Sequence, residues 1–281
     1  KTLMKFGIRE AVDVVFKALA PVTIGSTTFA KGEPVLYFDS LKTSTTEGTA
    51  TSVYAQGGRG NPRLIAWEGD KAITFSFEDA LISAEGMAIL TGAGLLEASG
   101  DGKIRVHQKA TVTGTIESKK VSVVLTDAIP ANGTLVTEDI FGFILDSNEE
   151  ISERLGAGTG SAASVKFAND TEQTGTVTVL VDYYVDMTAG AKEITITADQ
   201  FAGYYYIEGD TLFRRQADGV DLPAQLVIPN AKIQTNFTFT MASSGDPSTF
   251  TFTADAFPGK VKGNKTNKVL YALQIIEDPG E

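Results

Sequence analysis

The sequence predicts a mainly β fold, an antiparallel β-sandwich or barrel with one short α-helix. Runs rich in Thr, Val and Phe recur along all 281 residues, with Gly, Pro or Asp turns between them. β-branched and aromatic residues favour strands, and turns this short join antiparallel neighbours. The chain has no Cys and one His, which removes most routes to nucleophilic, acid–base or zinc chemistry. We therefore expect a structural protein and not an enzyme, with no catalytic, cofactor-binding or metal-binding residues.

The composition also limits the partners. The formal net charge is −11, from 24 basic and 35 acidic residues, so a groove that grips nucleic acid is disfavoured. The one gathering of Lys, between Lys260 and Lys268, is interleaved with Gly and Asn and indicates a solvated loop. No apolar run approaches the ~18–20 residues of a membrane span, and the N-terminus lacks the apolar stretch of a secretory signal. We expect no membrane partner.

The first elements are strands, with one ambiguity. Between Ile8 and Leu19 the apolar residues fit a helical face, but Val12, Val14 and Phe16 also alternate as in a strand. A short helix and a strand both remain open there. The next run, Pro34 to Leu41, predicts a buried strand, because Pro is tolerated at a strand's first position.

The segment from Thr43 to Asn61 is long, rich in Thr and poor in large apolar residues. A structureless loop of this length is unusual in a compact domain, so we expect an extended β arm that finds its partner on another subunit. Its Gly57–Asn61 end lacks the Lys-Ser/Thr of a phosphate-binding loop and predicts a turn or subunit contact. The candidate contact residues are Thr45, Thr46, Thr49, Thr51, Val53, Tyr54, Gln56, Arg59 and Asn61.

Two strands and the helix come next. The runs Leu64–Trp67 and Ala72–Phe77 predict strands on either side of a turn at Glu68-Gly69-Asp70. The segment Glu78–Leu95 then predicts the helix, with Ser83 as its N-cap and Gly92 at its end.

The rest of the chain predicts strands throughout. Ile104 to Tyr184 is strand-rich, and its Gly156–Ser161 segment has the composition of a flexible connection. Six further strands are expected in the last third: Ile194–Ile196, Tyr204–Ile207, Gln225–Ile228, Lys232–Met241, Thr249–Phe257 and Val269–Ile276.

Isolated polar residues do not amount to a chemical site. His107 has no second His, so a His-based metal site or triad is not credible. Asp79 and Asp255 are better explained as strand-end residues that accept hydrogen bonds from free backbone amides than as a catalytic pair. The acidic run from Asp146 lacks a calcium-loop pattern and predicts a solvated turn. The Tyr204–Tyr206 triplet cannot form one stacking platform in a strand, so core and edge packing is the better interpretation.

Six motifs in order carry a resemblance to a known family. They are PVLYFDSLKTS (34–44), GGRGNPRLIAW (57–67), KAITFSFEDALIS (71–83), GDTLFRR (209–215), QLVIPNAKIQTNFTFT (225–240) and GDPSTFTFTADAFP (245–258). Together they resemble the tail tube proteins of tailed bacteriophages. The resemblance covers both ends of the chain and leaves the middle unassigned.

The resemblance implies a β-sandwich core whose sheets join those of neighbouring subunits in a ring, with rings stacked into a hollow tube. Residues 1–103 and 191–281 would form the tube-forming β domain, and residues 104–190 a β-rich peripheral insertion. The implied function is a virion tail subunit, present in the host cytoplasm before assembly. Its partners would be copies of itself and other tail proteins, and genome DNA would pass through the lumen without specific binding.

Two other functions stay open. The chain could be another virion component of the same fold, such as a baseplate hub ring or a capsid decoration protein. It could also be a carbohydrate- or surface-binding β-sandwich, for which Trp67 and the Tyr204–Tyr206 run are the supporting features.

Overall fold

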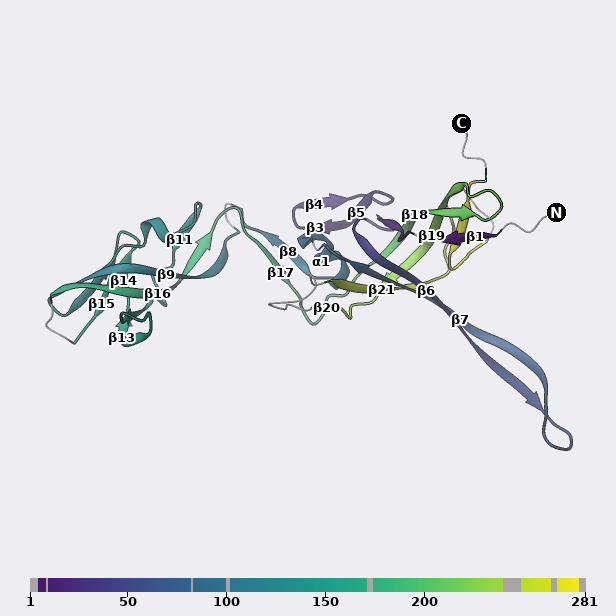
Figure 1. Cartoon of the computed structure of the whole chain (residues 1–281), viewed down its shortest axis with the longest axis horizontal. Coiled ribbons are helices and arrows are strands. Elements are labelled where there is room, and N and C mark those ends of the chain that lie inside the picture. Colours follow the sequence, from purple (N-terminus) through teal and green to yellow (C-terminus); the bar gives the residue numbers. More distant parts are fainter. Residues whose placement is uncertain are drawn as a thin grey trace. The chain divides into compact units, whose positions relative to one another are not determined.

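The structure is a computed structural model that describes residues 5–8, 10–81, 83–99, 102–170, 174–239, 249–263 and 267–277. The expected mainly β, antiparallel fold is confirmed (Figure 1). The chain divides into unit 1, residues 1–95 and 194–281, and unit 2, residues 96–193. The end of the expected Lys232–Met241 strand, the start of the 245–258 motif and Lys265 of the basic run lie outside the described residues.

Unit 1 is built on one large sheet that curls into a half-barrel. Its strand order is β5-β2-β18-β19-β21-β7-β6, and β1, β22 and β20 pair with β18, β19 and β21. The sheet strands are β1 (Phe6–Ile8), β2 (Asp13–Ala18), β5 (Pro34–Phe38), β6 (Leu41–Gln56), β7 (Arg63–Asp79), β18 (Tyr204–Arg215), β19 (Asp221–Ile233), β20 (Thr238–Phe239), β21 (Phe250–Ala256) and β22 (Ala272–Ile275). A small hairpin of β3 (Val22–Ile24) and β4 (Thr27–Phe29) lies apart from this sheet.

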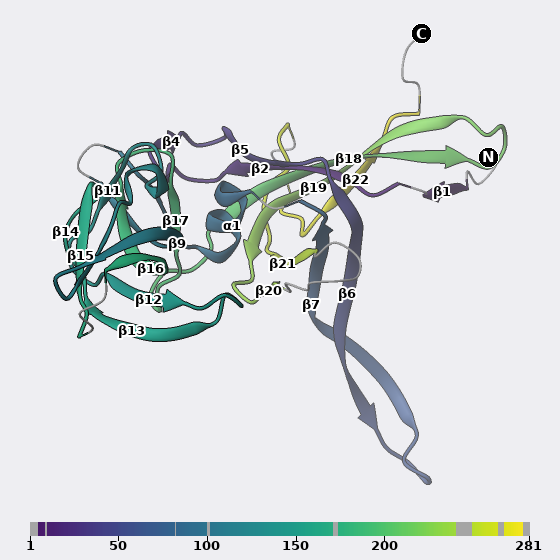
Figure 2. The ribbon, with the colours of Figure 1, turned by 60° about the vertical axis from the view of Figure 1, so that its left-hand side comes forward.

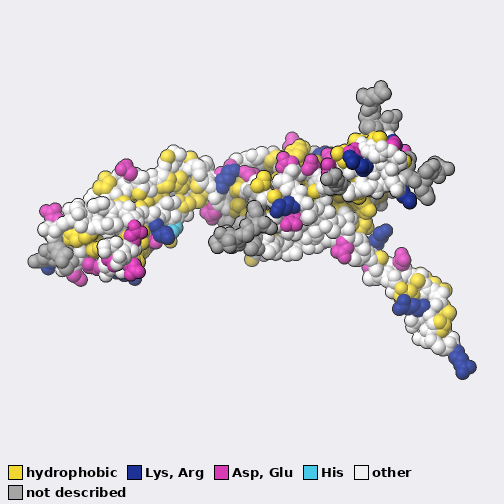
Figure 3. Space-filling view, in the orientation of Figure 1, with side chains coloured by type: hydrophobic (Ala, Val, Ile, Leu, Met, Phe, Trp, Pro, Cys, Tyr) yellow, Lys and Arg dark blue, Asp and Glu magenta, His cyan; other side chains and the backbone are white. Residues whose placement is uncertain are grey.

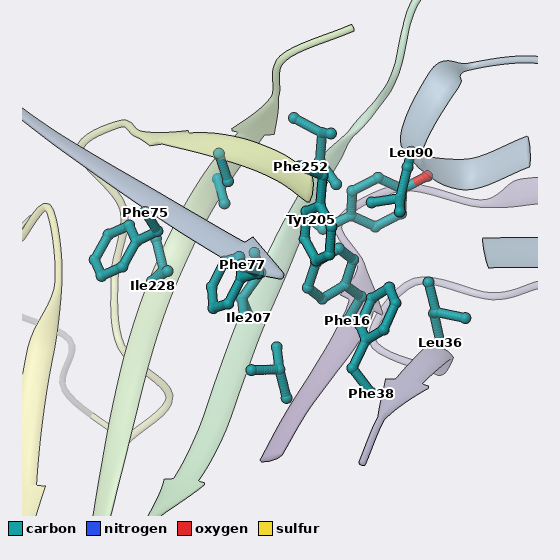
Figure 4. Packing of buried hydrophobic residues seen from close by; sticks show 14 of the residues in the cluster. Phe16, Leu36, Phe38, Phe75, Phe77, Leu90, Tyr205, Ile207, Ile228 and Phe252 are labelled. Carbon is teal, nitrogen blue, oxygen red and sulfur yellow. The ribbon is translucent and has the colours of Figure 1, made fainter. Parts of the chain in front are cut away.

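Aromatic rings from distant strands fill the core of unit 1 (Figure 4). The Phe252 ring centroid lies 5.0 Å from that of Phe38, 5.1 Å from that of Phe77 and 6.0 Å from that of Phe16. Each of these side chains is buried, and full burial of one Phe contributes about 1.5–3 kcal/mol. The four rings come from β2, β5, β7 and β21, so the core joins both ends of the sequence.

The ambiguity between Ile8 and Leu19 is settled in favour of a strand. Within β2 the side chains of Val14, Phe16 and Ala18 are buried and alternate with more exposed neighbours. Period-two burial belongs to a strand with one face on the core. β2 pairs with β5 on one side and β18 on the other, so long-range pairing overrides the helical alternative.

The predicted helix is confirmed, although it is shorter than expected. α1 spans Ala84–Thr91, and the Ser83 hydroxyl accepts a hydrogen bond of 2.9 Å from the backbone N–H of Gly86. Gly92 ends the helix at φ 71°, a conformation that favours Gly. A Cβ on Gly92 would lie 2.3 Å from the backbone carbon of Phe201. The helix does not begin at Glu78 because β7 continues to Asp79.

Unit 2 holds a second curled antiparallel sheet with a separate core. Its strand order is β13-β12-β16-β9-β10-β15-β14, and β11 pairs with β16. The elements are β9 (Ile104–Glu117), β10 (Lys120–Val123), the 3-10 helix η1 (Thr126–Ala128), β11 (Gly133–Leu135), β12 (Phe141–Leu145), β13 (Ile151–Ala157), β14 (Thr159–Ser161), β15 (Ser164–Ala168) and β16 (Gly175–Met187). Phe167, Tyr183 and Leu125 are among its fully buried side chains.

Two paired strands carry the chain from unit 1 into unit 2 and back. β8 (Gly94–Glu97) pairs with β17 (Lys192–Thr195). Within unit 2 the Ala98 N–H donates a 2.9 Å hydrogen bond to the Ala191 carbonyl, and Lys192 forms an ion pair of 3.2 Å with Glu97. The entry and exit of unit 2 are therefore adjacent.

The expectation that Gly156–Ser161 is a flexible connection is wrong. β13 and β14 occupy most of this segment, and both are paired within the sheet. A Cβ on Gly158 would lie 2.6 Å from the Phe167 ring, and one on Gly160 would lie 2.1 Å from the Ser164 carbonyl oxygen. These glycines are needed for close packing, which composition alone cannot distinguish from flexibility.

The tyrosine triplet packs on both faces of β18. Tyr205 belongs to the main core, and Tyr206 packs with Val227 and Val261 in a separate small cluster. Tyr204 is half exposed and contacts the Phe257 ring, with centroids 5.8 Å apart. Core and edge packing, the interpretation from the sequence, is confirmed.

Burial makes Tyr205 a source of alkaline instability, because it raises the pKa of the Tyr205 hydroxyl to about 12. The unfolded chain ionises this group near pH ~10, whereas the folded chain keeps its proton. The stabilisation is therefore complete below pH ~10 and is lost as the pH rises toward 12. Between pH ~9 and ~12, the unfolding free energy of the wild type should fall by about 2 kcal/mol more than that of Tyr205→Phe. Urea unfolding measures this, with Tyr204→Phe as the matched control; an unchanged pH profile in Tyr205→Phe contradicts the prediction.

Candidate assembly interface

A long two-stranded hairpin projects from unit 1 (Figure 2). β6 and β7 pair along nearly their whole length, from Leu41 opposite Asp79 to Gln56 opposite Arg63. Residues 45–72 of this hairpin are called the arm below. Apart from Ala55 and Gly57, every residue of the arm is exposed.

The arm confirms the extended conformation expected for Thr43–Asn61. Along one edge β6 pairs with β7 of the same chain, and the expected contact with another subunit stays a prediction. The two strands expected around a turn at Glu68–Asp70 are one strand, β7, and these three residues lie within it. The predicted turn is instead a register shift: two residues of β7 lie between Gly69 and Ala72, while one residue of β6 lies between Thr49 and Thr51.

Local hydrogen bonds hold this β-bulge. Asp70 adopts a positive φ of 49°. The Thr51 hydroxyl lies 3.1 Å from the Gly69 carbonyl oxygen and 2.9 Å from a carboxylate oxygen of Asp70. A bulge increases the local twist and bends the strand, so it changes the direction of the outer half of the arm.

The base of the arm is anchored in the core. Ile73, Phe75 and Phe77 alternate along β7 and are buried. The Thr74 hydroxyl donates to an Asp255 carboxylate oxygen at 3.1 Å. Hydrogen bonds from Thr249 and Thr43 hold the pKa of the Glu78 carboxyl below its ordinary value. The direction in which the arm leaves the domain is therefore set by buried residues.

The tip is a turn between Gln56 and Arg63. The Gly57 N–H donates to the Pro62 carbonyl at 3.3 Å, and the Asn61 N–H donates to that of Gly58 at 3.1 Å. The Asn61 side-chain amide donates to Gln56 at 3.3 Å. Gly58, Gly60 and Asn61 have positive φ angles of 84°, 88° and 49°, which explains the glycine-rich sequence without a phosphate ligand.

One face of the outer arm carries four apolar side chains, called the apolar tip face. Val53 lies opposite Trp67 and Ala55 lies opposite Ile65, so the four share one face of the hairpin. Val53, Ile65 and Trp67 are 66%, 55% and 55% exposed. Figure 3 shows apolar side chains gathered on the outer arm. Soluble chains seldom leave such a surface uncovered.

The outer part of the arm, residues 48–67, is also basic. Its charged residues are Arg59 and Arg63, in a chain of net charge −11. Arg63 lies over the Tyr54 ring, with 4.0 Å from its guanidinium carbon to the ring centroid. This cation–π contact is on the face opposite the apolar tip face.

The nine candidate contact residues all lie along this hairpin but do not form one patch. Thr45 and Thr46 are at its base, Thr49 and Thr51 flank the bulge, and the other five lie at the outer end. The candidate list leaves out the second strand of the arm, which supplies the exposed apolar residues Leu64, Ile65 and Trp67. The signal in the sequence for this apolar surface was the apolar run Leu64–Trp67.

Polar residues considered for chemistry are accounted for by local structure. His107 lies 2.8 Å from an Asp182 carboxylate oxygen on the surface of unit 2. The Asp146 carboxylate accepts backbone N–H bonds from Asn148 and Glu150 at 2.8 and 2.9 Å, as expected for a turn. Among the residues that the structure describes, no three His, Asp or Glu side chains gather as a metal site would require.

The two aspartates considered as a pair have different roles. Asp79 ends β7, is buried and accepts hydrogen bonds from the Ser40 hydroxyl and the Leu81 N–H, as the strand-end interpretation requires. Asp255 does not follow a strand; it lies within β21, and the Gln234 side-chain amide donates to it at 2.9 Å. The strand-end interpretation is therefore wrong for Asp255.

The family of the chain is given by comparison with known proteins. Residues 22–271 match the YomU/Tube protein family. The chain belongs to this family. The match includes the whole arm and all of unit 2. No curated protein matches the chain.

Membership of the YomU/Tube family makes the chain a phage tube-type structural protein. The tail tube resemblance of the sequence is supported at this coarser level. In the described part of the chain, no helix is both long and apolar enough to span a membrane.

The exposed tip predicts a preferred site of proteolysis. Arg59 lies in the solvent-exposed turn between two strands, where a protease can bind the backbone. Limited trypsin digestion of the unassembled chain should cut first after Arg59, giving fragments detectable by mass spectrometry. Arg59→Gln should abolish this early product, whereas Arg154→Gln, within paired β13, should not change it. Early cleavage near Gly156–Ser161 by a protease without sequence preference would contradict the assignment of β13 and β14.

Proposed function

We propose that the chain is the subunit of a bacteriophage tail tube, polymerising into rings that stack to form the conduit for DNA delivery. In this role it resides in the virion tail, and in the host cytoplasm before assembly. Its partners are copies of itself and other tail proteins. Membership of the YomU/Tube family supports a tube-type structural role, and the shape and surface of the arm support the finer assignment.

The observation that carries the proposal is the exposed arm. An isolated two-stranded hairpin is marginally stable in water, and this one leaves Val53, Ile65 and Trp67 more than half exposed. Such a surface is stable in an assembly in which a neighbouring subunit covers it. We therefore propose all nine candidate residues, Thr45, Thr46, Thr49, Thr51, Val53, Tyr54, Gln56, Arg59 and Asn61, as subunit contacts, together with Leu64, Ile65 and Trp67.

The sheet of unit 1 supports ring formation in a second way. Its path ends at β5 on one side and at β6 on the other. Unpaired strand edges invite pairing with another chain, and a head-to-tail contact that closes on itself produces a ring. Contacts between subunits along these edges would leave no open edge in the finished ring.

The insertion is proposed to lie at the periphery. In this arrangement residues 1–103 and 191–281 form the tube wall, and residues 104–190 project from it. The separate core of unit 2 supports this division, because a domain with its own core does not need the ring for stability.

Shortening the arm tests the proposal. Removal of residues 53–67, with Ser52 joined to Glu68 through an Asn-Gly turn, keeps the base of the hairpin paired. This variant should fold but remain monomeric, because it lacks the exposed apolar surface. Sedimentation velocity and negative-stain electron microscopy distinguish monomers, rings and tubes.

The matched control replaces the Lys119 turn between β9 and β10 of unit 2 with the same Asn-Gly sequence. It should assemble as the wild type does. Normal tubes from the shortened variant would disprove the role of the arm. Assembly of the wild type into single rings only, or onto other virion surfaces, would favour a baseplate hub or a decoration protein.

A tube through which DNA passes should not bind that DNA tightly. Each Lys or Arg contact with a phosphate adds affinity, and the net charge of −11 opposes such contacts. Assembled protein should show no measurable binding to duplex DNA at ~150 mM salt in a fluorescence anisotropy assay. Tight, salt-sensitive binding that is lost when Lys260, Lys262 and Lys268 are replaced by Gln would indicate a packaging or anchoring role instead.

A further inference from the structure

A groove with an apolar floor lies at the base of the arm. It has a volume of about 220 Å³. Its apolar lining includes Ile8, Phe75, Phe213, Leu226, Tyr271 and Leu273. Phe75 and Phe213 form a buried floor, whereas Ile8, Tyr271 and Leu273 are 67%, 39% and 47% exposed at its mouth. At ~30 Å³ per water molecule, the volume is sufficient for a large side chain.

One carboxylate, that of Glu10, lies at the side of this groove, and Glu10 also lines an adjoining cavity that contains Asp13 and Asp210. Asp13 and Asp210 are direct cross-strand neighbours of β2 and β18, and they lie on the sheet face opposite the buried Val14 and Phe213. Arg214, which lines another cavity beside Glu10, is bound to Asp221 through two hydrogen bonds of 2.6 and 2.5 Å.

The groove and the outer arm are complementary. The groove is apolar with Glu10 at its side, whereas the outer arm presents an apolar face with Arg59 in the turn at its end. Complementary charge fixes the orientation of a contact whose affinity comes from apolar burial. A groove and an arm with these properties on one chain point to a contact between two copies.

The arm cannot fill the groove of its own chain. Thr46 lines the groove, and Gln56 lies ten residues further along the same strand. At ~3.3 Å per residue the tip is about 33 Å away while the hairpin stays paired. Because donor and acceptor are at opposite ends of one hairpin, each copy can give one contact and receive another. Such a head-to-tail contact propagates from subunit to subunit.

We propose that the apolar tip face of one subunit binds the groove at the arm base of the next copy, with Arg59 of the turn facing Glu10. This inference rests on the proposed tube function and names the acceptor surface that the arm requires. Trp67 is the side chain that enters the groove, because it is the largest on the apolar tip face.

The absence of Cys allows a direct test. In the full chain, Ile8→Cys and Ile65→Cys together place one thiol at the groove mouth and one on the apolar tip face. Mild oxidation under assembly conditions should give a ladder of covalent oligomers on non-reducing gels, and neither single variant should give a ladder. The control pairs Ile65→Cys with Ile151→Cys, an equally exposed Ile of unit 2, and should give no ladder.

A charge exchange tests the same contact without a covalent bond. Arg59→Glu and Glu10→Arg should each raise the protein concentration needed for assembly by tenfold or more, because like charges then meet at the interface. The double variant should recover most of the wild-type assembly. Arg59→Gln, which removes the charge without reversing it, should have a smaller effect.

The outcomes separate this inference from the proposed function. Wild-type assembly that needs the arm, with no ladder and no recovery in the double charge variant, would place the acceptor elsewhere and leave the tube function intact. A wild-type chain that remains monomeric under all assembly conditions would overturn both.

Discussion

The continuity of β7 determines the rest of unit 1. One strand runs from the tip of the arm into the aromatic core, where Phe75 and Phe77 pair with β21 and pack against it. Side chains alternate between the two faces of a strand, so a slip of one residue would turn both rings toward solvent. The buried rings therefore fix the register of the whole hairpin. Together with the bulge at Asp70, they also determine which way Trp67 points, although Trp67 is exposed and does not belong to the core cluster.

The surface of the arm follows from this constraint. A strand with a buried half can keep its exposed half extended, because the pairing of β6 with β7 continues beyond the core. The chain exposes apolar area at the tip of the arm. In the proposed assembly, contact with another copy would bury this area and would link the stability of the arm to protein concentration.

The sequence predicted well what local chemistry decides. The caps of α1, Ser83 and Gly92, are single residues whose backbone preferences are sufficient to place the helix ends. The extended conformation of Thr43–Asn61 followed from its length and composition. The pairing of that segment did not, because the identity of a strand's partner depends on contacts distant in the sequence. The candidate list accordingly covered β6 and the tip but left out Leu64, Ile65 and Trp67 on the other strand.

Most of the incorrect predictions from the sequence concerned segments rich in glycine or acidic residues. Glu68-Gly69-Asp70 has the composition of a turn, yet the chain uses it as a bulge within a continuous strand. Gly158 and Gly160 resemble a linker, yet Phe167 and the Ser164 carbonyl lie too close to these positions for any side chain. At Gly158 and Gly160 glycine is required by the close approach of a neighbour that only the folded chain reveals. Asp255 shows the same limit, since the Gln234 amide that binds it is 21 residues away in sequence.

The pairing of β8 with β17 has a consequence for how such a chain can evolve. Because unit 2 begins and ends on adjacent strands, residues 96–193 constrain unit 1 in the same way as a hairpin loop would. Loop closure costs only about 0.6 kcal/mol for each doubling of length. A domain of different size or surface, with ends one strand spacing apart, could be exchanged at this position with little effect on the host. The pair β8 and β17 thus marks a position at which recombination could change the inserted domain and preserve unit 1.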